Sequence, residues 1–411
     1  MKVTMNACRA CTSRHLYNFL SLGDHPPANY FLDEEQRKKA EPVFPLEVFA
    51  CLDCGLIEIP DQIPADFFTH YLYVPSASTT MHKHFSDLAV KLTKRFLQAK
   101  NELIVDIGSN DGLFLGVCKK LGANTLGIEP AVNIAALARE KGVEVFNTYF
   151  NDETAREAAK RWSKAKVIIT TNTFSHIDDL HTFMKGVSIL LRDDGVFVVE
   201  VPCALDLVEK NEFDTVYHEH LSTFSLKSIS DLFHFFDMEI FDIERLEIHG
   251  GSMRILAQKK SVGGNVSPKV ATWITKEDES GLFKKETYDA LAVRVKKNKE
   301  ELIQFLTELK KEGKRLAGYG APAKGNTLLN YYGIGTQYLD YLADKNPLKH
   351  GRLSPGMHVP IVSADKIAET HPDYLLILAW NFSEEIMSQQ EAYRRKGGKF
   401  ILPIPELQIV E

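Results

Sequence analysis

Cysteine, net charge and long apolar runs are all scarce in this sequence of 411 residues. Six cysteines are too few to hold a chain of this length together, so a disulfide scaffold is excluded. A formal net charge of −6 gives no general basic surface, which argues against extended nucleic-acid binding and leaves small anionic ligands as partners. No window approaches the roughly 18 apolar residues of a membrane span, and the first residues contain no apolar signal core. We therefore expect a soluble cytoplasmic protein with no membrane or nucleic-acid partner.

Four of the six cysteines form two pairs of equal spacing, Cys8-x-x-Cys11 and Cys51-x-x-Cys54. Two such pairs supply the four thiolates of a tetrahedral zinc ion, and the residues between them can fold back as a ribbon. Because sulfur fills all four positions, none is left for a catalytic water, so we predict structural Zn²⁺. Thiol redox chemistry is the alternative. Cys118 and Cys203 lie in apolar surroundings and are expected to be buried.

A glycine turn follows an apolar strand in the stretch 103–112. Its spacing, Asp106-x-Gly108-x-x-x-Gly112, is that of class I methyltransferases rather than the G-x-G-x-x-G of dinucleotide-binding folds. A second strand, residues 125–129, ends in an acid that can bind both ribose hydroxyls of an adenosyl group. We therefore predict S-adenosylmethionine as cofactor, in contact with Asp106, Gly108, Ser109, Asn110, Gly112, Glu129 and Asn172.

Acid and base side chains gather after the next two strands, which we expect at residues 166–171 and 195–201 on either side of a helix at 178–191. His176 follows the first strand, and Val216-Tyr217-His218-Glu219-His220 follows the second. The carboxyl ends of strands form the ligand crevice of a doubly wound sheet, so both segments are expected to reach it. Imidazoles, a carboxylate and a phenol suit proton transfer; solvated or structural histidines are the alternative.

The last third of the chain indicates a second sheet. A charged helix at 285–311 precedes a strand and glycine turn at 315–320, then strands at 338–343, 373–379 and 399–402 with a helix at 383–396. The glycines at 318, 320 and 325 miss the dinucleotide pattern, so we predict a Rossmann-like sheet without a dinucleotide. Lys324, near its first helix N-terminus, is a candidate to bind a pyrophosphate, with simple sheet packing as the alternative.

These motifs together resemble one family over nearly the whole chain, the S-adenosylmethionine-dependent sugar C-methyltransferases that act on nucleotide-linked 4-keto-6-deoxy sugars. The adenosylmethionine loop is shared by many chemistries, whereas the Tyr-x-Glu-His cluster followed by a Gly-Tyr-Gly segment is much more specific. The matching segments are the cysteine pairs with Pro27-Ala28-Asn29 between them, Tyr71-Leu72-Tyr73 with Ala77-Ser78, the glycine turn, Tyr217-His218-Glu219-His220, His249-Gly250-Gly251-Ser252 and residues 318–327.

The resemblance implies an α/β fold in three domains. These are a small N-terminal zinc-binding domain at 1–75, a central class I methyltransferase Rossmann-like sheet at 76–245 and a second Rossmann-like C-terminal domain at 246–411. The implied reaction is C-methylation, at carbon 3, of a dTDP- or GDP-linked keto sugar through an enolate, by a monomer or weak homo-oligomer. The alternatives are a zinc-containing methyltransferase that acts on another small molecule or on RNA, and a non-catalytic zinc-bearing scaffold that binds a nucleotide.

The resemblance also implies roles for residues. His220 would be the base, Glu219 would orient or charge-tune a histidine, and Tyr217 or His176 would hydrogen-bond the oxyanion. His218 matches no role. The implied substrate residues are Tyr71, Tyr73, Ser78, Tyr319, Lys324, Asn326, Lys345, Arg352 and Asn381.

Overall fold

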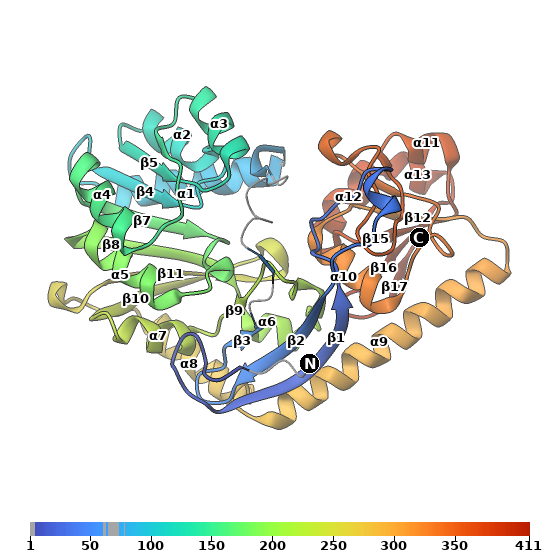
Figure 1. The fold of residues 1–411 in the computed structure, drawn as a ribbon, viewed down its shortest axis with the longest axis horizontal. Coiled ribbons are helices and arrows are strands. Elements are labelled where there is room, and N and C mark those ends of the chain that lie inside the picture. Colours follow the sequence, from blue (N-terminus) through green and yellow to red (C-terminus); the bar gives the residue numbers. More distant parts are fainter. Residues whose placement is uncertain (1–4, 61–62, 65–73, 78) are drawn as a thin grey trace.

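The computed structural model describes residues 5–60, 63–64, 74–77 and 79–411. Three expected substrate residues, Tyr71, Tyr73 and Ser78, lie outside the described residues. Two α/β lobes stand side by side, and a two-stranded ribbon and a long helix run beneath both of them (Figure 1). In the described part of the chain, no helix is long and apolar enough to cross a membrane.

The N-terminal part is an antiparallel sheet dominated by the ribbon β1–β2, with strand order β1-β2-β3-β9. Alternating apolar residues such as Leu20, Leu22, Leu46 and Val48 are buried on one side of the ribbon. β9 comes from the middle of the chain and pairs with β3, so this part is built into the methyltransferase lobe. The strands are Leu16–His25 (β1), Phe44–Cys51 (β2), Ile57–Glu58 (β3) and Ser222–Thr223 (β9).

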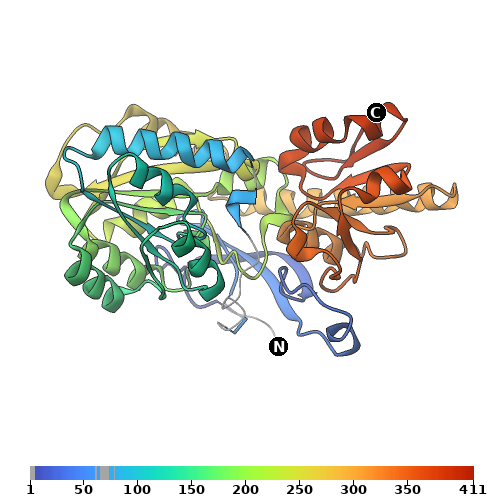
Figure 2. The same cartoon turned by 90° about the horizontal axis from the view of Figure 1, so that it is seen from above.

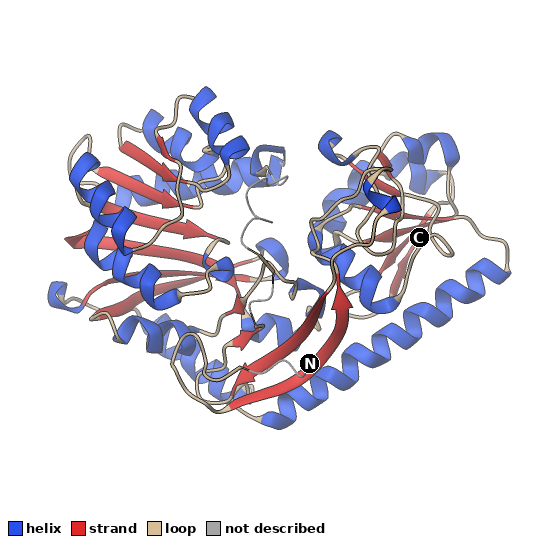
Figure 3. Cartoon of the chain, viewed as in Figure 1, coloured by secondary structure: helices blue, strands red, loops and turns tan. Residues whose placement is uncertain are grey.

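The central lobe is a seven-stranded sheet in the order β10-β11-β8-β7-β4-β5-β6. All its strands are parallel except β11, which runs antiparallel to both neighbours. The strands are Leu103–Ile107 (β4), Asn124–Ile128 (β5), Val145–Phe146 (β6), Ala165–Thr171 (β7), Leu191–Pro202 (β8), Met238–Leu246 (β10) and Ser252–Lys259 (β11). The central strands β4, β7 and the second half of β8 are mostly apolar because helices cover both faces of the sheet (Figure 3).

Helices α1, α2 and α3 pack on one face of this sheet, and α4, α5 and α7 pack on the other. Figure 2 shows α1 lying across the lobe. The helices are Thr79–Phe96 (α1), Leu113–Lys120 (α2), Val132–Glu140 (α3), Asp152–Trp162 (α4), Leu180–Leu190 (α5), Ala204–Glu209 (α6) and Leu226–His234 (α7).

The C-terminal lobe is a six-stranded sheet in the order β14-β13-β12-β15-β16-β17, parallel except for β17. The strands are Leu316–Tyr319 (β12), Leu342–Asp344 (β13), Ile361–Ser363 (β14), Tyr374–Ile377 (β15), Lys399–Leu402 (β16) and Gln408–Val410 (β17). Its helices are Ala323–Tyr332 (α10), Lys366–Thr370 (α11), Ser383–Gln389 (α12) and Glu391–Arg395 (α13). Two helices precede this lobe in the chain: Pro268–Glu279 (α8), which packs against the central lobe, and Lys285–Lys311 (α9), which runs beneath both lobes (Figure 1). The fold class predicted from the sequence is confirmed.

Two elements of this lobe differ from the sequence prediction. The strand expected at 338–343 is confined to β13, because the backbone N–H groups of Tyr338 and Leu339 both donate to Gly335 O in a turn. The helix expected at 383–396 is two helices, because Gln390 between them has φ −97° and ψ 22°, outside helical geometry.

Candidate active site

One cavity of about 900 Å³ lies between the two lobes and is lined by residues from both. It collects most of the residues that the sequence singled out, from segments far apart in the chain. On the methyltransferase side it is lined by Asp106, Gly108, Ser109, Asn110, Glu129, Asn172, His176, Tyr217, His218 and His220. On the C-terminal side it is lined by Tyr319, Lys324, Lys345, Lys349 and Asn381.

The glycine turn after β4 requires its glycines. Gly108 has φ +78°, and a Cβ atom there would lie 2.0 Å from Thr173 Oγ1. Gly112 has φ +74°, and a Cβ atom there would lie 2.9 Å from Val143 Cγ2. Gly108 therefore shapes the cavity wall, whereas Gly112, which is not among the described cavity-lining residues, allows the turn to pack at the start of α2.

Glu129 closes the turn from the end of β5. Its Oε2 accepts a hydrogen bond from Asn110 N at 3.0 Å, and its Oε1 accepts one from Ala131 N at 2.9 Å. Burial raises the pKa of Glu129. Burial and the charges of Glu129 and Glu200 raise the pKa of Asp106 to about 8. Among the described residues, Asp106 Oδ1 and Ser109 Oγ have no hydrogen-bond partner, so the site fits a polar ligand such as S-adenosylmethionine.

A buried ion-pair network supports the same side of the cavity. Glu200, near the end of β8, lies 2.9 Å from His84 Nε2 and 2.5 Å from Arg254 Nε. Burial opposes ionisation, yet these two partners hold the pKa of Glu200 below its ordinary value. Glu200 O also accepts a hydrogen bond from Asn172 N at 2.8 Å, which positions Asn172 at the cavity.

Tyr217 and His220 form a hydrogen-bonded pair on the cavity wall. Tyr217 Oη lies 2.7 Å from His220 Nε2, and His220 Nδ1 lies 2.9 Å from Thr215 O. Because a carbonyl oxygen only accepts, Nδ1 carries the proton and Nε2 accepts from the Tyr217 hydroxyl. The ring of His176 lies 5.1 Å from that of His220, centroid to centroid. Burial lowers the pKa of His176 to about 4, so at neutral pH its imidazole is uncharged.

His218 contacts the ribbon, and Glu219 contacts the connection between the two ribbon strands. His218 Nε2 lies 3.2 Å from Phe44 O and 3.3 Å from Pro45 O, and burial lowers the pKa of His218. Glu219 Oε1 accepts a hydrogen bond from Asn29 Nδ2 at 2.6 Å. The sequence offered no role for His218, and the structure shows that it ties residues 216–220 to β2. We call these residues the catalytic segment, after the role expected from the sequence.

Lys324 and Asn381 meet at the cavity on the C-terminal side. Lys324 Nζ donates to Asn381 Oδ1 and lies 3.8 Å from the centroid of the Trp380 ring. Burial lowers the pKa of Lys324 to about 8, although the charges of Asp214 and Glu212 oppose the shift. Both residues follow the carboxyl ends of neighbouring parallel strands, β12 and β15, as the sequence predicted.

Lys349 is a cavity cation that the sequence reasoning missed, four residues after Lys345. Its Nζ donates to Ala321 O at 2.8 Å and lies 4.0 Å from Asp344 Oδ2. Burial lowers its pKa, and the charges of Asp344 and Glu219 oppose that shift. The only feature of the sequence that indicated Lys349 is that, like Lys345, it is a cation that follows a strand.

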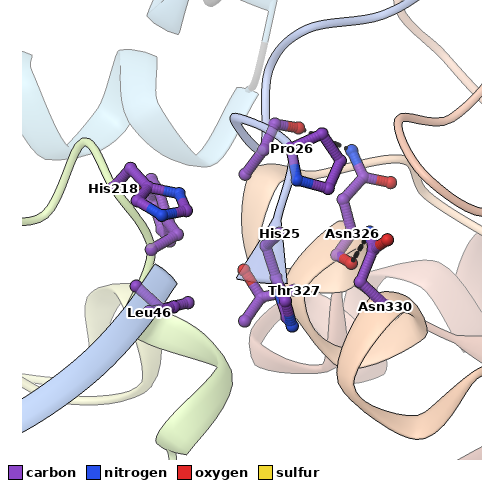
Figure 4. A pocket seen from close by; sticks show the side chains of 9 residues that line it. His25, Pro26, Leu46, His218, Asn326, Thr327 and Asn330 are labelled. Carbon is purple, nitrogen blue, oxygen red and sulfur yellow. Dashed lines mark hydrogen bonds between the residues drawn. The ribbon is translucent and has the colours of Figure 1, made fainter. Parts of the chain in front are cut away.

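Two expected substrate residues lie elsewhere and hold the ribbon. Asn326 Nδ2 donates to Ala28 O at 2.8 Å, and Arg352 Nη1 donates to Phe31 O at 3.3 Å. Neither is among the described residues that line the cavity. Figure 4 shows a small adjacent pocket in which His25 and Pro26 of the ribbon lie between His218 on one side and Asn326 on the other.

The four paired cysteines converge as a metal centre. Cys8 Sγ lies 3.7 Å from Cys54 Sγ and Cys11 Sγ lies 3.6 Å from Cys51 Sγ. All four sulfur atoms lie within 4.8 Å of one another. Zinc–sulfur bonds of about 2.3 Å in a tetrahedron put sulfur atoms about 3.8 Å apart, so the donor set fits structural Zn²⁺.

The central sheet and its cavity define a class I S-adenosylmethionine-dependent methyltransferase, here with a zinc-binding part and a second α/β lobe. Three families match the sequence: a zinc binding domain over residues 8–68, a methyltransferase domain over 81–242 and the C-methyltransferase C-terminal domain over 247–405. The chain is 35% identical to C-methyltransferase NovU of Streptomyces niveus over 407 residues, which cover 99% of this chain and 97% of that protein. The chain belongs to the NovU-like family of S-adenosylmethionine-dependent C-methyltransferases.

More distant relatives match only part of the chain. A ubiquinone biosynthesis O-methyltransferase of Azorhizobium caulinodans is 26% identical over 100 residues, which cover 23% of this chain and 38% of that protein. The solved structure of magnesium protoporphyrin IX methyltransferase from Synechocystis, with bound S-adenosylmethionine, is 11% identical with a TM-score of 0.34 and covers 43% of this chain and 79% of its own. The solved structure of a possible histamine N-methyltransferase from Thermotoga maritima is 19% identical with a TM-score of 0.33. The match covers 44% of this chain and 90% of that one.

Proposed function

We propose that this C-methyltransferase methylates carbon 3 of a nucleoside-diphosphate-linked 4-keto-6-deoxy sugar, with His220 as the base. The observation that carries the proposal is a single cavity lined by the methyltransferase crevice, by the Tyr217–His220 pair and by the lysines of the C-terminal sheet. A methyl donor on one side and an anionic nucleotide on the other would meet at the base. The resemblance of the sequence motifs to sugar C-methyltransferases supports the same substrate class.

Proton removal would start at His220 Nε2. A carbon beside a ketone loses its proton when the enolate oxygen is stabilised, and carbon 3 adjoins the carbonyl at carbon 4. Thr215 O keeps Nδ1 protonated, so proton uptake at Nε2 gives an imidazolium. Because Nε2 has a single lone pair, the Tyr217 hydroxyl must first turn from Nε2 toward the carbonyl oxygen at carbon 4. The Nε2–H formed by proton uptake then donates to the Tyr217 oxygen, while the Tyr217 hydroxyl donates to the enolate oxygen. The uncharged imidazole of His176 is a second donor for that oxygen.

The remaining residues would hold the reactants. Bound S-adenosylmethionine supplies an electrophilic sulfonium methyl group for the enolate carbon. Lys324 and Lys349 present cations that suit a diphosphate at the C-terminal strand ends. Thr80 Oγ1 donates to Glu385 Oε2 at 2.7 Å, a contact between the lobes that helps to exclude water. The domain limit at residue 75 is kept in this proposal, and the limit at 245 is moved past residue 259, because β11 belongs to the central sheet.

The test is solvent exchange at carbon 3. We expect wild-type protein to exchange the carbon 3 hydrogen of a nucleotide-linked keto sugar for deuterium when no methyl donor is present. His220→Asn should abolish this exchange and lower kcat by roughly 100-fold, the usual contribution of a positioned base, while leaving the affinity for S-adenosylhomocysteine intact. The exposed His234, replaced in the same way, serves as the control. Continued exchange in His220→Asn would move the base role to His176 or Tyr217, and an inactive wild type would reject the substrate class.

A further inference from the structure

Two side chains of the catalytic segment attach it to the ribbon and to the connection between the two ribbon strands. His218 donates to carbonyl oxygens of β2, and Glu219 accepts the 2.6 Å hydrogen bond from Asn29. Tyr217 and His220, on either side of them, form the pair on the cavity wall. Any movement of residues 218 and 219 must therefore change the direction in which Tyr217 and His220 point.

The backbone around Asn29 is itself fixed from both sides. Ala28 O accepts from Asn326 on α10, and Phe31 O accepts from Arg352. Tyr30 N donates to Pro27 O at 2.9 Å and Phe31 N donates to Asn29 O at 3.0 Å, which makes a compact turn. Figure 4 shows Asn326 beside Pro26 at this junction. The Asn29 amide thus comes from a rigid support that the C-terminal lobe holds.

The chemistry of the contact is suited to positioning. Glu219 is 4% exposed, so its carboxylate depends on protein donors rather than on water. A neutral amide donates to a carboxylate without removing its charge, and the side chain of asparagine has few rotamers to lose. Asn29 also lines the cavity, so it lies between the ribbon and the reaction site.

We propose that Asn29 is a positioning residue for methyl transfer: its amide holds Glu219, and through it sets the geometry of Tyr217 and His220. The inference rests on the roles proposed above for Tyr217 and His220. It also gives the ribbon, which the zinc centre anchors at one end and the C-terminal lobe at the other, a direct connection to the reacting groups.

Kinetics of two variants test the proposal. Asn29→Ala should lower kcat by about 10- to 100-fold while changing KM for either substrate by no more than about twofold, because alignment rather than binding is lost. Asn29→Asp places a second carboxyl group against Glu219, and two such groups share a proton at low pH. Its kcat relative to that of Asn29→Ala should therefore rise as the pH falls from 8 to about 5.5. A purely structural role would not produce this pH profile.

The ribbon offers a matched control. Asn18 Nδ2 of β1 donates to Glu47 Oε2 of β2 at 3.0 Å, so the same pair of groups occurs on the ribbon itself, exposed and far from the catalytic segment in sequence. Asn18→Ala and Asn18→Asp should keep the wild-type kcat and pH profile. A wild-type kcat in Asn29→Ala, or parallel pH profiles for Asn29→Ala and Asn29→Asp, overturns the proposal.

Amide hydrogen exchange tests the positioning role of Asn29 without any substrate. Residues 216–220 should exchange faster in Asn29→Ala than in wild type, and at the wild-type rate in Asn18→Ala. Unchanged exchange in Asn29→Ala overturns the positioning role. If wild-type protein does not act on keto sugars, the proposed substrate fails while the exchange result still decides the role of Asn29.

Discussion

The two ring nitrogens of His220 have different tasks, and the structure separates them. Nδ1 is committed to Thr215 O, which leaves Nε2 as the basic atom, and the partner of Nε2 is the Tyr217 hydroxyl. A histidine run in a sequence shows neither the tautomer nor the partner, since both depend on where the chain folds back. In the proposed mechanism, proton transfer and oxyanion binding would therefore be coupled through this hydrogen bond of 2.7 Å.

Glu129 holds the glycine turn and faces the cavity, which makes its contribution to cofactor binding measurable. We expect Glu129→Ala to weaken binding of S-adenosylhomocysteine by about 1–3 kcal/mol, because charge-assisted hydrogen bonds to the ribose are lost. Titration calorimetry measures the change, with Glu140→Ala, an exposed acid on α3, as control. Unchanged affinity would mean that Glu129 only closes the turn through Asn110 and Ala131.

Elements that are locally encoded could be read from the sequence. The helix expected at 285–311 and the strand expected at 399–402 match α9 and β16 residue for residue, since periodicity and apolar runs specify them. β9 could not be found, because it has two residues and exists only through pairing with β3. The break at Gln390 interrupts a segment that otherwise has good helix formers.

The residues of the candidate site also divide into those that the sequence could predict and those that it could not. Residues just after strand ends, such as Asn172, His176 and Lys324, could be placed because parallel strands share one crevice. His84 and Asn29 could not, because their partners Glu200 and Glu219 lie 116 and 190 residues away in the chain. Long-range polar pairs leave no periodic trace in a single sequence.

The ribbon carries a buried histidine that should make the fold sensitive to acid. His25 in β1 is 4% exposed, its Nε2 lies 2.9 Å from Leu22 O, and burial lowers its pKa to about 4. Between that value and the ordinary value of about 6.5, the unfolded chain binds a proton that the folded chain does not. Stability is therefore complete above pH 6.5 and falls as the pH is lowered, by up to about 1.4 kcal/mol per pH unit for this group.

Urea unfolding at pH 7, 6 and 5 measures this effect. We expect His25→Gln to reduce the loss of unfolding free energy between pH 7 and 5 relative to wild type. Replacement of the exposed His234 should leave that loss unchanged. If the unfolding free energy falls equally with pH in wild type and in His25→Gln, His25 does not remain neutral in the folded protein.

At the scale of the whole molecule, the ribbon and α9 are the parts that span both lobes (Figure 1). One end of the ribbon bears the cysteine cluster, and Cys8, Cys51 and Cys54 share a hydrophobic core with the methyltransferase sheet. The other end is paired with the C-terminal lobe through Leu32 and Leu353. The relative position of the two halves of the cavity therefore depends on the ribbon.

Loss of zinc should therefore also disturb the structure of the active site. Ser225 Oγ donates to Cys54 O at 2.5 Å, and β3, just beyond Cys54, pairs with β9, which follows His220 by one residue. Structural zinc contributes on the order of 10 kcal/mol to the folding of a small module. The loss of one zinc ligand should therefore disturb the structure beyond the cysteine cluster itself. We expect one zinc per chain in wild-type protein, and none in Cys51→Ser.

Metal analysis, thermal unfolding and turnover together check this expectation. Cys51→Ser should lose methyl transfer and unfold in two steps, because the ribbon separates before the sheets of the two lobes. Cys118→Ala is the matched control: it is a buried cysteine of α2 outside the cluster, and it should keep zinc, the single transition and turnover. Wild-type protein without zinc, or an active Cys51→Ser, would show that the cysteine centre does not support the catalytic segment.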